Sequence, residues 1–318
     1  MNSKLNKSLA KLGTFRSLCL SVMMLAVTTG ALAQVNRLPS FVMAANHPPL
    51  VMPTTPTDIA DFAPRQTALF KPAASLGGGP FPALVLSPTC AGVGPHLRYW
   101  VQEGLKAGYV VLVLDHMWPR GVGVICGKSS DLSFGQGAKD AQAALEHLAG
   151  LGYVDPHKIA LMGFSWGGAV AFLVGSSGAS NHPNIKNRSG LRYAASIAVY
   201  PVCHHPAFSR GGGMTSPELD FALPDIDRPV LALLGELDHE EDPVECTRRI
   251  AAVKQRGATV ELTVLPNATH AWDSPEANGR TTHMPWMPKA GTFEYSVPIT
   301  EMSRDRAFAF MQKSLTKQ

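Results

Sequence analysis

Six short apolar runs, each about the length of a strand, alternate with helical patterns along most of the chain. They lie at residues 83–87, 109–115, 158–163, 194–200, 229–235 and 259–266. Helical spacing of apolar residues occurs at 95–107, 137–148, 168–175, 243–257 and 301–315. Strands that are apolar throughout must be covered on both faces, which is typical of a parallel sheet between layers of helices. We therefore predict an α/β fold with a mostly parallel central sheet and helices on both faces.

The first 33 residues have the pattern of an export signal. Four basic residues precede the apolar run 18–27, and Ala31-Leu32-Ala33 forms a small-x-small cleavage site. The alternative is an uncleaved anchor, although the run is short for a membrane span. We expect a signal peptide at 1–33, an N-terminal extension with leading strands at 34–80 and the main domain at 81–318. The mature protein is then periplasmic or secreted and has no stable membrane anchor.

The charge of the chain depends on this segment. The whole sequence has 28 basic and 24 acidic residues, and residues 1–33 contain four of the basic residues and none of the acidic ones. Removal of the signal leaves 24 of each and a formal net charge of zero. A neutral mature chain gives no electrostatic reason to expect nucleic acid or a membrane surface as a partner.

Four cysteines remain after cleavage, because Cys19 lies in the signal. They are Cys90, Cys126, Cys203 and Cys246. An even number in an exported chain favours two disulfides, and the sequence spacing leaves all three pairings open. His204 and His205 adjoin Cys203, but neither CxxC nor HxxxH spacing is present, so a metal site is the less favoured alternative.

The hexapeptide GFSWGG, residues 163–168, joins a predicted strand to a predicted helix. It contains G-x-S-x-G, the nucleophile elbow, in which small residues on both sides of the serine permit a very tight turn. The turn presents the serine at the end of the sheet, near the N–H groups at the start of the following helix. Because the strand and the helix stand where the motif requires them, Ser165 is predicted to be a nucleophile and not part of a simple glycine-rich turn.

A serine hydroxyl needs a base, and later loops offer an acid and a histidine in the order Ser, Asp, His. Asp238 follows the run at 229–235, and His270 follows the run at 259–266. We expect His270 to accept the proton of Ser165, and Asp238 to orient the imidazole and stabilise the imidazolium. The alternative base is His283. The alternative acids, which otherwise form a solvated helix start, are Glu236, Glu240, Glu241 and Asp242.

Two backbone N–H groups are expected to stabilise the oxyanion that forms after attack. One belongs to the residue that follows the nucleophile, here Trp166. The other comes from the loop after an early strand, where Cys90 or Ala91 can supply it.

Four stretches together resemble the dienelactone hydrolase family of the α/β-hydrolase superfamily. "SPTCAGVGPHLRYWVQEGLKAGYVVLVLDHMWPRG" resembles the oxyanion loop, first helix and next strand; "YVDPHKIALMGFSWGG" resembles the elbow, "LLGELD" the acid loop and "ATHAW" the histidine loop. The resemblance implies an α/β-hydrolase fold and the cleavage of an ester or lactone. The founding enzymes use a cysteine nucleophile, and Ser165 stands in its place here, which implies general esterase activity. The early loop begins Pro88-Thr89 where many relatives have His-Gly. The founding enzymes hold the carboxylate of a cyclic lactone with arginines; these cannot be assigned to positions here, although Arg120 in "WPRG" is a plausible loop residue.

The resemblance also implies a pairing for the cysteines. Cys90 and Cys126 lie in loops after adjacent early strands, and Cys203 and Cys246 follow two later strands. The implied disulfides are Cys90–Cys126 and Cys203–Cys246.

We thus predict an exported serine hydrolase that cleaves a small-molecule ester or lactone through an acyl-enzyme, with no metal or organic cofactor. The alternatives are a peptidase or polyester hydrolase of the same fold, and a non-catalytic binding protein that retains the fold. The insert at 203–228 is a candidate lid. Four tryptophans could line an aromatic pocket or pack in the core: Trp100, Trp118, Trp166 and Trp272.

Overall fold

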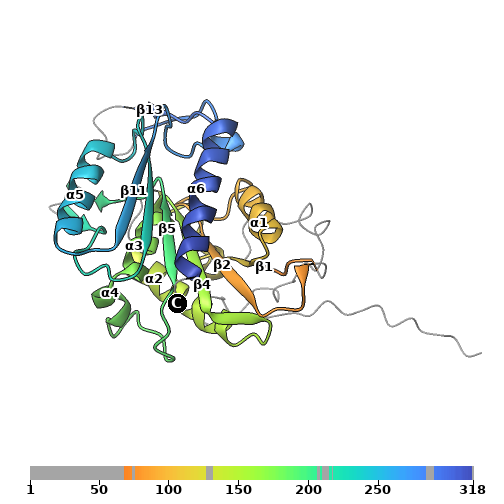
Figure 1. Cartoon of the computed structure of the whole chain (residues 1–318). Coiled ribbons are helices and arrows are strands. Elements are labelled where there is room, and N and C mark those ends of the chain that lie inside the picture. The colour runs from red at the N-terminus through yellow and green to blue at the C-terminus, as the bar shows by residue number, and fades with distance from the viewer. Residues whose placement is uncertain are drawn as a thin grey trace, which may run out of the picture. The chain divides into compact units, whose positions relative to one another are not determined.

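A seven-stranded sheet forms the centre of the computed structural model (Figure 1). The structure describes residues 68–73, 76–126, 132–205, 208–209, 215–216, 218–283 and 290–316. The expected signal peptide and most of the expected N-terminal extension lie outside these ranges, and both stay predictions.

The strand order of the sheet is β1-β3-β2-β4-β5-β10-β11. The strands are β1 (Ala68–Phe70), β2 (Phe81–Ser87), β3 (Val110–Val113), β4 (Val154–Phe164), β5 (Ala195–Val199), β10 (Val230–Gly235) and β11 (Val260–Leu265). Strand β1 pairs antiparallel with β3, and the other neighbours pair in parallel. The predicted mostly parallel α/β sheet is confirmed, and β1 is a leading strand within the expected extension.

Strand β4 begins earlier than the apolar run at 158–163 suggests. The strand starts at Val154, which pairs with Phe81, and the register shifts between Phe81 and Ala83. This irregularity allows pairing to continue through a half-exposed polar stretch, which an apolar pattern does not reveal.

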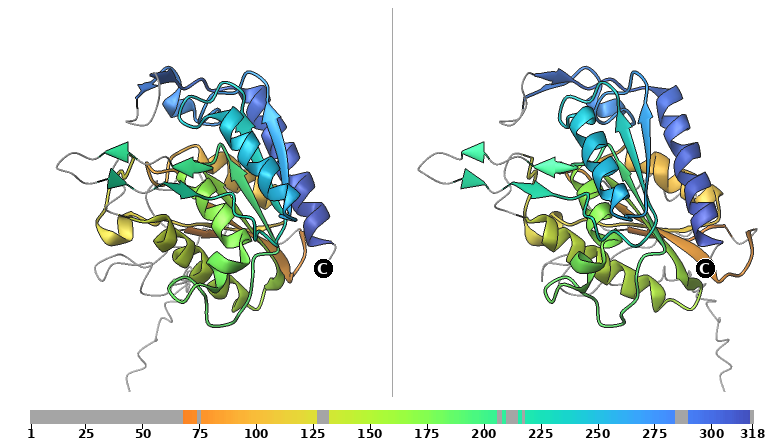
Figure 2. Two further views of the ribbon diagram at one scale, coloured as in Figure 1. Left: turned by 90° about the vertical axis from the view of Figure 1, so that its left-hand side faces the viewer. Right: turned by 60° about the vertical axis from the view of Figure 1, so that its left-hand side comes forward.

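Helices cover both faces of the sheet (Figures 1 and 2). The core on one face is completed by α1 (Leu97–Lys106) and α6 (Val297–Leu315); the core on the other is completed by α2 (Phe134–Ala149), α3 (Trp166–Gly175) and α5 (Pro243–Gln255). Strand residues alternate between the two cores: Val85 packs with α2 and α3, whereas Leu84 and Leu86 pack with α1. Both layers are therefore held by burial of apolar area.

Two helices begin earlier than their apolar spacing indicates, because polar residues cap them. Ser133 and Gln136 form a capping box at the start of α2, and each side chain accepts a backbone N–H of the other residue. The Ser296 side chain accepts the N–H of Ile299 at the start of α6. Such caps extend a helix beyond its buried face.

The remaining elements are short and lie outside the central sheet. They are α4 (Ser177–Asn181), the 3-10 turns η3 (Trp118–Arg120) and η4 (Pro275–Ala277), and the strands β6 (His204–His205), β7 (Phe208–Ser209), β8 (Thr215–Ser216), β9 (Leu219–Asp220), β12 (Thr281–Thr282) and β13 (Gly291–Thr292). Strands β6 to β9 form two small antiparallel pairs in the insert after β5 (Figure 2). Part of 203–228 falls outside the described residues, so a lid stays a prediction.

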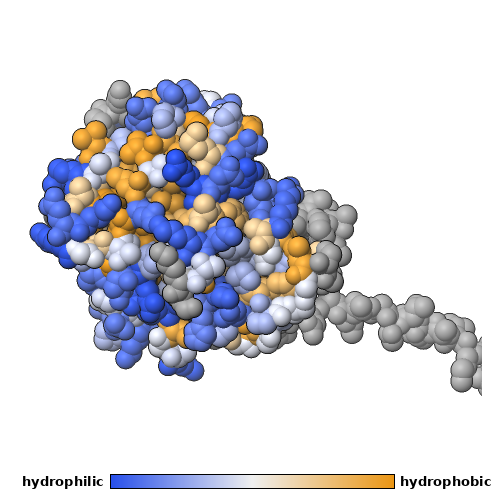
Figure 3. Space-filling model, in the orientation of Figure 1, coloured by the Kyte–Doolittle hydropathy of each residue, from blue (hydrophilic) through white to orange (hydrophobic). Residues whose placement is uncertain are grey.

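Apolar side chains reach the surface near the edge strand β11 (Figure 3). Val264 on β11 and Met302 on α6 are both exposed. Strand β11 has a sheet neighbour on one side only, so part of its surface lacks cover. Among the described residues, no helix combines the length and apolarity that crossing a membrane requires.

Candidate active site

The turn between β4 and α3 presents Ser165 at the carboxyl end of the sheet. Ser165 has φ 52° and ψ −111°, a backbone conformation that residues with side chains rarely adopt. A Cβ atom on Gly163 would overlap the carbonyl oxygen of Gly167, and one on Gly167 would overlap that of Ser87. The N–H of Ser165 donates to the carbonyl of Val199 at 2.9 Å. The serine is therefore held in a strained turn that only small neighbours permit.

His270 and Asp238 continue from Ser165 in one hydrogen-bonded line. Nε2 of His270 lies 2.9 Å from Oγ of Ser165, and Nδ1 of His270 lies 2.9 Å from Oδ2 of Asp238. The loops that carry the acid and the histidine follow β10 and β11, which are neighbours in the parallel sheet. The three residues that the sequence singles out thus meet at one edge of the sheet, whereas His283 is exposed.

The line is shielded from solvent. Ser165 and His270 are each 4% exposed. The ring of Tyr200 packs against the imidazole of His270 with 4.9 Å between ring centroids, and the Tyr200 hydroxyl donates to Asp273 at 2.7 Å. Hydrogen bonds in such a site are stronger than they would be in water.

Asp238 contacts the imidazole of His270 with one carboxylate oxygen and accepts backbone hydrogen bonds from its own loop with the other. Oδ1 of Asp238 accepts the N–H groups of Glu240 at 2.9 Å and Glu241 at 3.0 Å. Asp242 accepts the N–H groups of Val244 and Glu245 and caps α5, which is the helix-start role considered for it above. Asp238 is therefore fixed in position by the turn that follows it.

A second carboxylate of this loop reaches the other side of the histidine ring. Oε2 of Glu240 lies 3.2 Å from Nε2 of His270, and the Glu240 side chain is 12% exposed. Burial lowers the pKa of His270, but the nearby carboxylates of Asp238, Glu240 and Glu241 outweigh it and raise the pKa to about 9. Burial also raises the pKa of Glu241 well above its usual range.

The start of α3 and the loop after β2 lie together at the elbow. Trp166 is the first residue of α3, where backbone N–H groups have no acceptor within the helix. The N–H of Gly167 donates to the carbonyl of Pro88 at 3.1 Å, which ties the loop after β2 to the elbow. The N–H of Ala91 donates to Oγ1 of Thr89 within that loop at 3.2 Å. The N–H of Ala91 is thus already engaged within the loop.

A second Ser-His-Asp chain lies beneath the site, and sequence reasoning missed it. Oγ of Ser87 lies 2.9 Å from Nε2 of His116, and Nδ1 of His116 lies 2.9 Å from Oδ2 of Asp140. Ser87, His116 and Asp140 are all completely buried, so no substrate can reach this serine. Arg120 donates to both oxygens of Asp140, and the His116 ring contacts the indole of Trp166. Through this contact with Trp166, the residue after Ser165, the network packs against the elbow. The only member of the network that the sequence could have marked is His116, which follows β3 closely; its partners lie far from it in the sequence.

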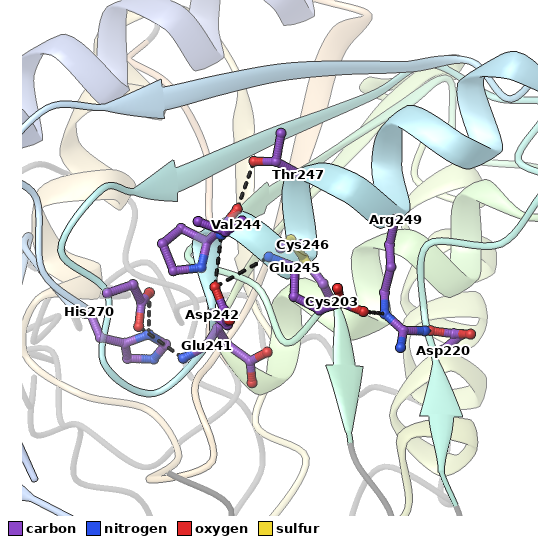
Figure 4. The surroundings of a disulfide bond; sticks show 12 residues. Cys203, Asp220, Glu241, Asp242, Val244, Glu245, Cys246, Thr247, Arg249 and His270 are labelled. Carbon is purple, nitrogen blue, oxygen red and sulfur yellow. Dashed lines mark hydrogen bonds and ion pairs between the residues drawn. A yellow bond between two sulfur atoms is a disulfide. The ribbon is translucent and has the colours of Figure 1, made fainter. Parts of the chain in front are cut away.

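Two disulfides fasten the loops around the site. Cys90 is joined to Cys126 and Cys203 to Cys246, with Cα–Cα distances of 4.9 Å and 5.6 Å; these are the pairs that the resemblance implied. The second disulfide links the insert after β5 to α5 just beyond the acid loop (Figure 4). Glu241 is held there too, through a hydrogen bond from the backbone of Cys203.

The tryptophans divide between core and surface. Trp100 and Trp272 are completely buried and donate to Asp273 and Ser303, so they belong to the core and do not line a pocket. Trp118 is 43% exposed. The indole of Trp166 stacks on Phe134 at 5.6 Å between ring centroids.

The histidines beside Cys203 take part in a short strand. His204 and His205 form β6, and Nε2 of His204 lies 2.8 Å from a carboxylate oxygen of Glu218. Across the described ranges, no group of three or more His, Cys, Asp or Glu side chains could hold a metal ion.

A doubly covered parallel sheet with a serine elbow, and with acid and histidine loops after later strands, defines an α/β hydrolase. The family model for the dienelactone hydrolase family matches residues 66–315. The chain belongs to this family, which confirms the resemblance read from the four stretches.

Curated relatives agree with this assignment. They carry the name of candidate carboxymethylenebutenolidases. A protein of Methylorubrum extorquens is 26% identical over 61% of this chain, and one of Escherichia coli O157:H7 is 28% identical over 62% of it. The chain spans 64% of the first relative and 69% of the second.

Solved structures share the fold. An esterase of Thermogutta terrifontis with bound butyrate has a TM-score of 0.54 at 18% identity and covers 78% of this chain and 88% of its own. A dienelactone hydrolase-like promiscuous phosphotriesterase from metagenomic libraries has a TM-score of 0.51 at 20% identity, covering 74% and 88%. At these identities the likeness concerns the fold alone.

Proposed function

We propose that this protein is a serine hydrolase that cleaves a small carboxylic ester or lactone. The hydrogen-bonded line from Asp238 through His270 to Ser165 is the observation that carries the proposal. Membership of the dienelactone hydrolase family supports action on ester bonds. The names of the curated relatives suggest the same class of substrate.

The reaction follows from the roles that these groups can take. Oγ of Ser165 attacks the carbonyl carbon while Nε2 of His270 accepts the hydroxyl proton, and the backbone N–H groups of Trp166 and Cys90 bind the oxyanion. The tetrahedral intermediate then releases the alcohol, which takes the proton from His270. A water molecule attacks the acyl-enzyme in the same manner, and the acid leaves while Ser165 regains its proton.

Asp238 has a supporting part in both steps. Its carboxylate accepts a hydrogen bond from the Nδ1–H group of His270. This fixes the proton on Nδ1 and leaves Nε2 free to accept a proton from Ser165. It also stabilises the imidazolium that forms after proton transfer. Neither step needs a metal or an organic cofactor.

A cavity lies beside the loop after β2. It has a volume of about 510 Å³ and is lined by Ala91–Val93 and by the exposed ring of Trp118, among others. This volume is within the range of small-molecule sites. The lining of the cavity does not include Ser165, His270 or Asp238. The preference for soluble esters and lactones over the peptides and polyesters that a same-fold enzyme could also cleave therefore rests on the family and on the names of the curated relatives.

Export is part of the proposal. Two disulfides are typical of an oxidising compartment, which is consistent with a periplasmic or secreted protein. We propose that residues 1–33 are a signal peptide and that the catalytic domain follows the extension at 34–80. A small ester or lactone is the expected partner, and nucleic acid is not.

A fluorophosphonate probe tests the nucleophile. The mature protein should gain one label, located on the peptide that contains Ser165, and Ser165→Ala should gain none. Equal labelling of both proteins, or an unlabelled native protein, contradicts the proposal. A panel of linear esters, lactones, peptides and polymer films then separates the substrate classes. Ligand binding without turnover of any ester would favour a non-catalytic role.

A further inference from the structure

Two carboxylates of a single turn contact opposite nitrogens of His270. Oδ2 of Asp238 lies 2.9 Å from Nδ1, and Oε2 of Glu240 lies 3.2 Å from Nε2. The turn itself fixes this arrangement, because the N–H of Glu240 donates to Oδ1 of Asp238. An acid on Nδ1 is the ordinary partner of a catalytic histidine, whereas an acid on Nε2 shares the nitrogen that Ser165 uses.

The position of Glu240 matters because Nε2 takes part in every proton transfer of the proposed reaction. This nitrogen accepts the proton of Ser165 and then delivers it to the leaving alcohol. A group 3.2 Å from Nε2 therefore lies beside the path of that alcohol. His270 also faces Asp238, Glu241 and the hydroxyl of Ser165, together with the rings of Tyr200 and Phe293.

We propose that Glu240 is a positioning and specificity residue that disfavours esters whose leaving alcohol bears a negative charge. The inference rests on the proposed function and adds a substrate class to it: esters and lactones with a neutral or cationic leaving group. The acid on Nε2 acts through His270 and does not itself form or break a bond.

Electrostatics gives the direction of the effect. The Glu240 side chain is only 12% exposed, so solvent screens its charge weakly. An anionic leaving group that must approach Nε2 meets this charge at close range, and like charges in a specific site are an effective means of rejecting a ligand. A neutral alcohol of the same shape meets no such repulsion.

Glu240 also affects the activation of Ser165. A protonated His270 between two carboxylates cannot accept the proton of Ser165. Glu240 stabilises this protonated form, in which Ser165 stays inactive until the imidazolium loses its proton. Removing the charge of Glu240 should therefore allow His270 to act as a base at lower pH.

A pair of nearly isosteric substrates tests the proposal. 4-Acetoxybenzoate and 4-acetoxybenzamide carry the same acyl group, and their leaving phenols differ mainly in charge. The measured quantity is the kcat/KM for 4-acetoxybenzamide divided by the kcat/KM for 4-acetoxybenzoate, after correction for spontaneous hydrolysis. We expect this ratio to be about tenfold or more in the native enzyme. Glu240→Gln should reduce it at least fivefold, and should move the acid limb of the pH profile to lower pH.

Two further variants separate charge from structure. Glu240→Asp keeps the charge and should retain most of the discrimination. Glu236→Gln removes a charge from the same loop but keeps an oxygen to accept the N–H of Asn267, and should leave both the ratio and the pH profile unchanged.

The outcomes are distinguishable. An unchanged ratio and pH profile in folded, active Glu240→Gln overturns the inference but leaves the proposed function intact. A native enzyme that neither hydrolyses 4-acetoxybenzamide nor takes the fluorophosphonate label overturns both.

Discussion

Because His270 stays protonated up to high pH, the enzyme should be most active at alkaline pH. The pKa of His270 is about 9, against an ordinary value of 6.5, a difference of roughly 3 kcal/mol. At pH 7 only about one His270 in a hundred is then neutral and able to accept the proton of Ser165. Because the general base must be neutral, kcat/KM should rise about tenfold per pH unit between pH 7 and 8 and level off above pH 9.

The assay is the initial hydrolysis rate of a neutral ester between pH 6 and 10, measured well below KM. The substrate should release an alcohol that does not ionise in this range, because its signal then stays constant. A plateau that begins near pH 7 would refute the reasoning, since it would mean that the carboxylates around His270 do not hold its proton.

The same group affects stability in a defined direction. A pKa raised in the folded state stabilises the protein fully below about pH 6.5, and this contribution is lost as the pH rises through about 9. The native protein and His270→Gln can be compared by urea unfolding at pH 6 and pH 9.5. We expect the difference in unfolding free energy between the two proteins to shift by roughly 3 kcal/mol against the native protein at the higher pH.

Three other perturbations test the scaffold. Gly163→Ala places a Cβ atom on the carbonyl of Gly167, so soluble Gly163→Ala protein should lose fluorophosphonate labelling; normal labelling would show that the elbow tolerates a side chain. His116→Ala removes one of the partners of buried Asp140, which keeps Arg120, and should cost about 1–3 kcal/mol in urea unfolding, whereas unchanged stability would make the network dispensable. Reduction of both disulfides should remove about 2–4 kcal/mol for each and lower Tm, and an identical Tm with and without reductant would contradict this.

Much of the fold could be predicted because apolar burial leaves a direct pattern in the sequence. Strands such as β10 are buried along their whole length, and the predicted run at 229–235 covers it. The start of β4 could not be predicted, because it depends on pairing with Phe81 and not on apolarity. The start of α6 was missed because the cap at Ser296 extends the helix beyond its buried face.

The candidate site could be predicted as far as loop order allows. Parallel strands place successive loops at one edge, so the order Ser165, Asp238, His270 was enough to bring those residues together. The second carboxylate on His270 could not be foreseen, because which of several neighbouring acids reaches Nε2 depends on the conformation of a tight turn. The buried Ser87-His116-Asp140 chain depends on contact between the end of β2, the loop after β3 and helix α2, which are distant in sequence, and no spacing reveals it.

Capture of the covalent intermediate tests the central claim most directly. A slowly deacylated ester is mixed with the mature protein, the reaction is quenched in acid within the first turnover, and the intact mass and peptides are measured. We predict one acyl group per molecule on Oγ of Ser165, a burst of alcohol equal to the enzyme concentration, and neither in Ser165→Ala. Turnover without an acyl adduct, or an adduct on another residue, would contradict the account.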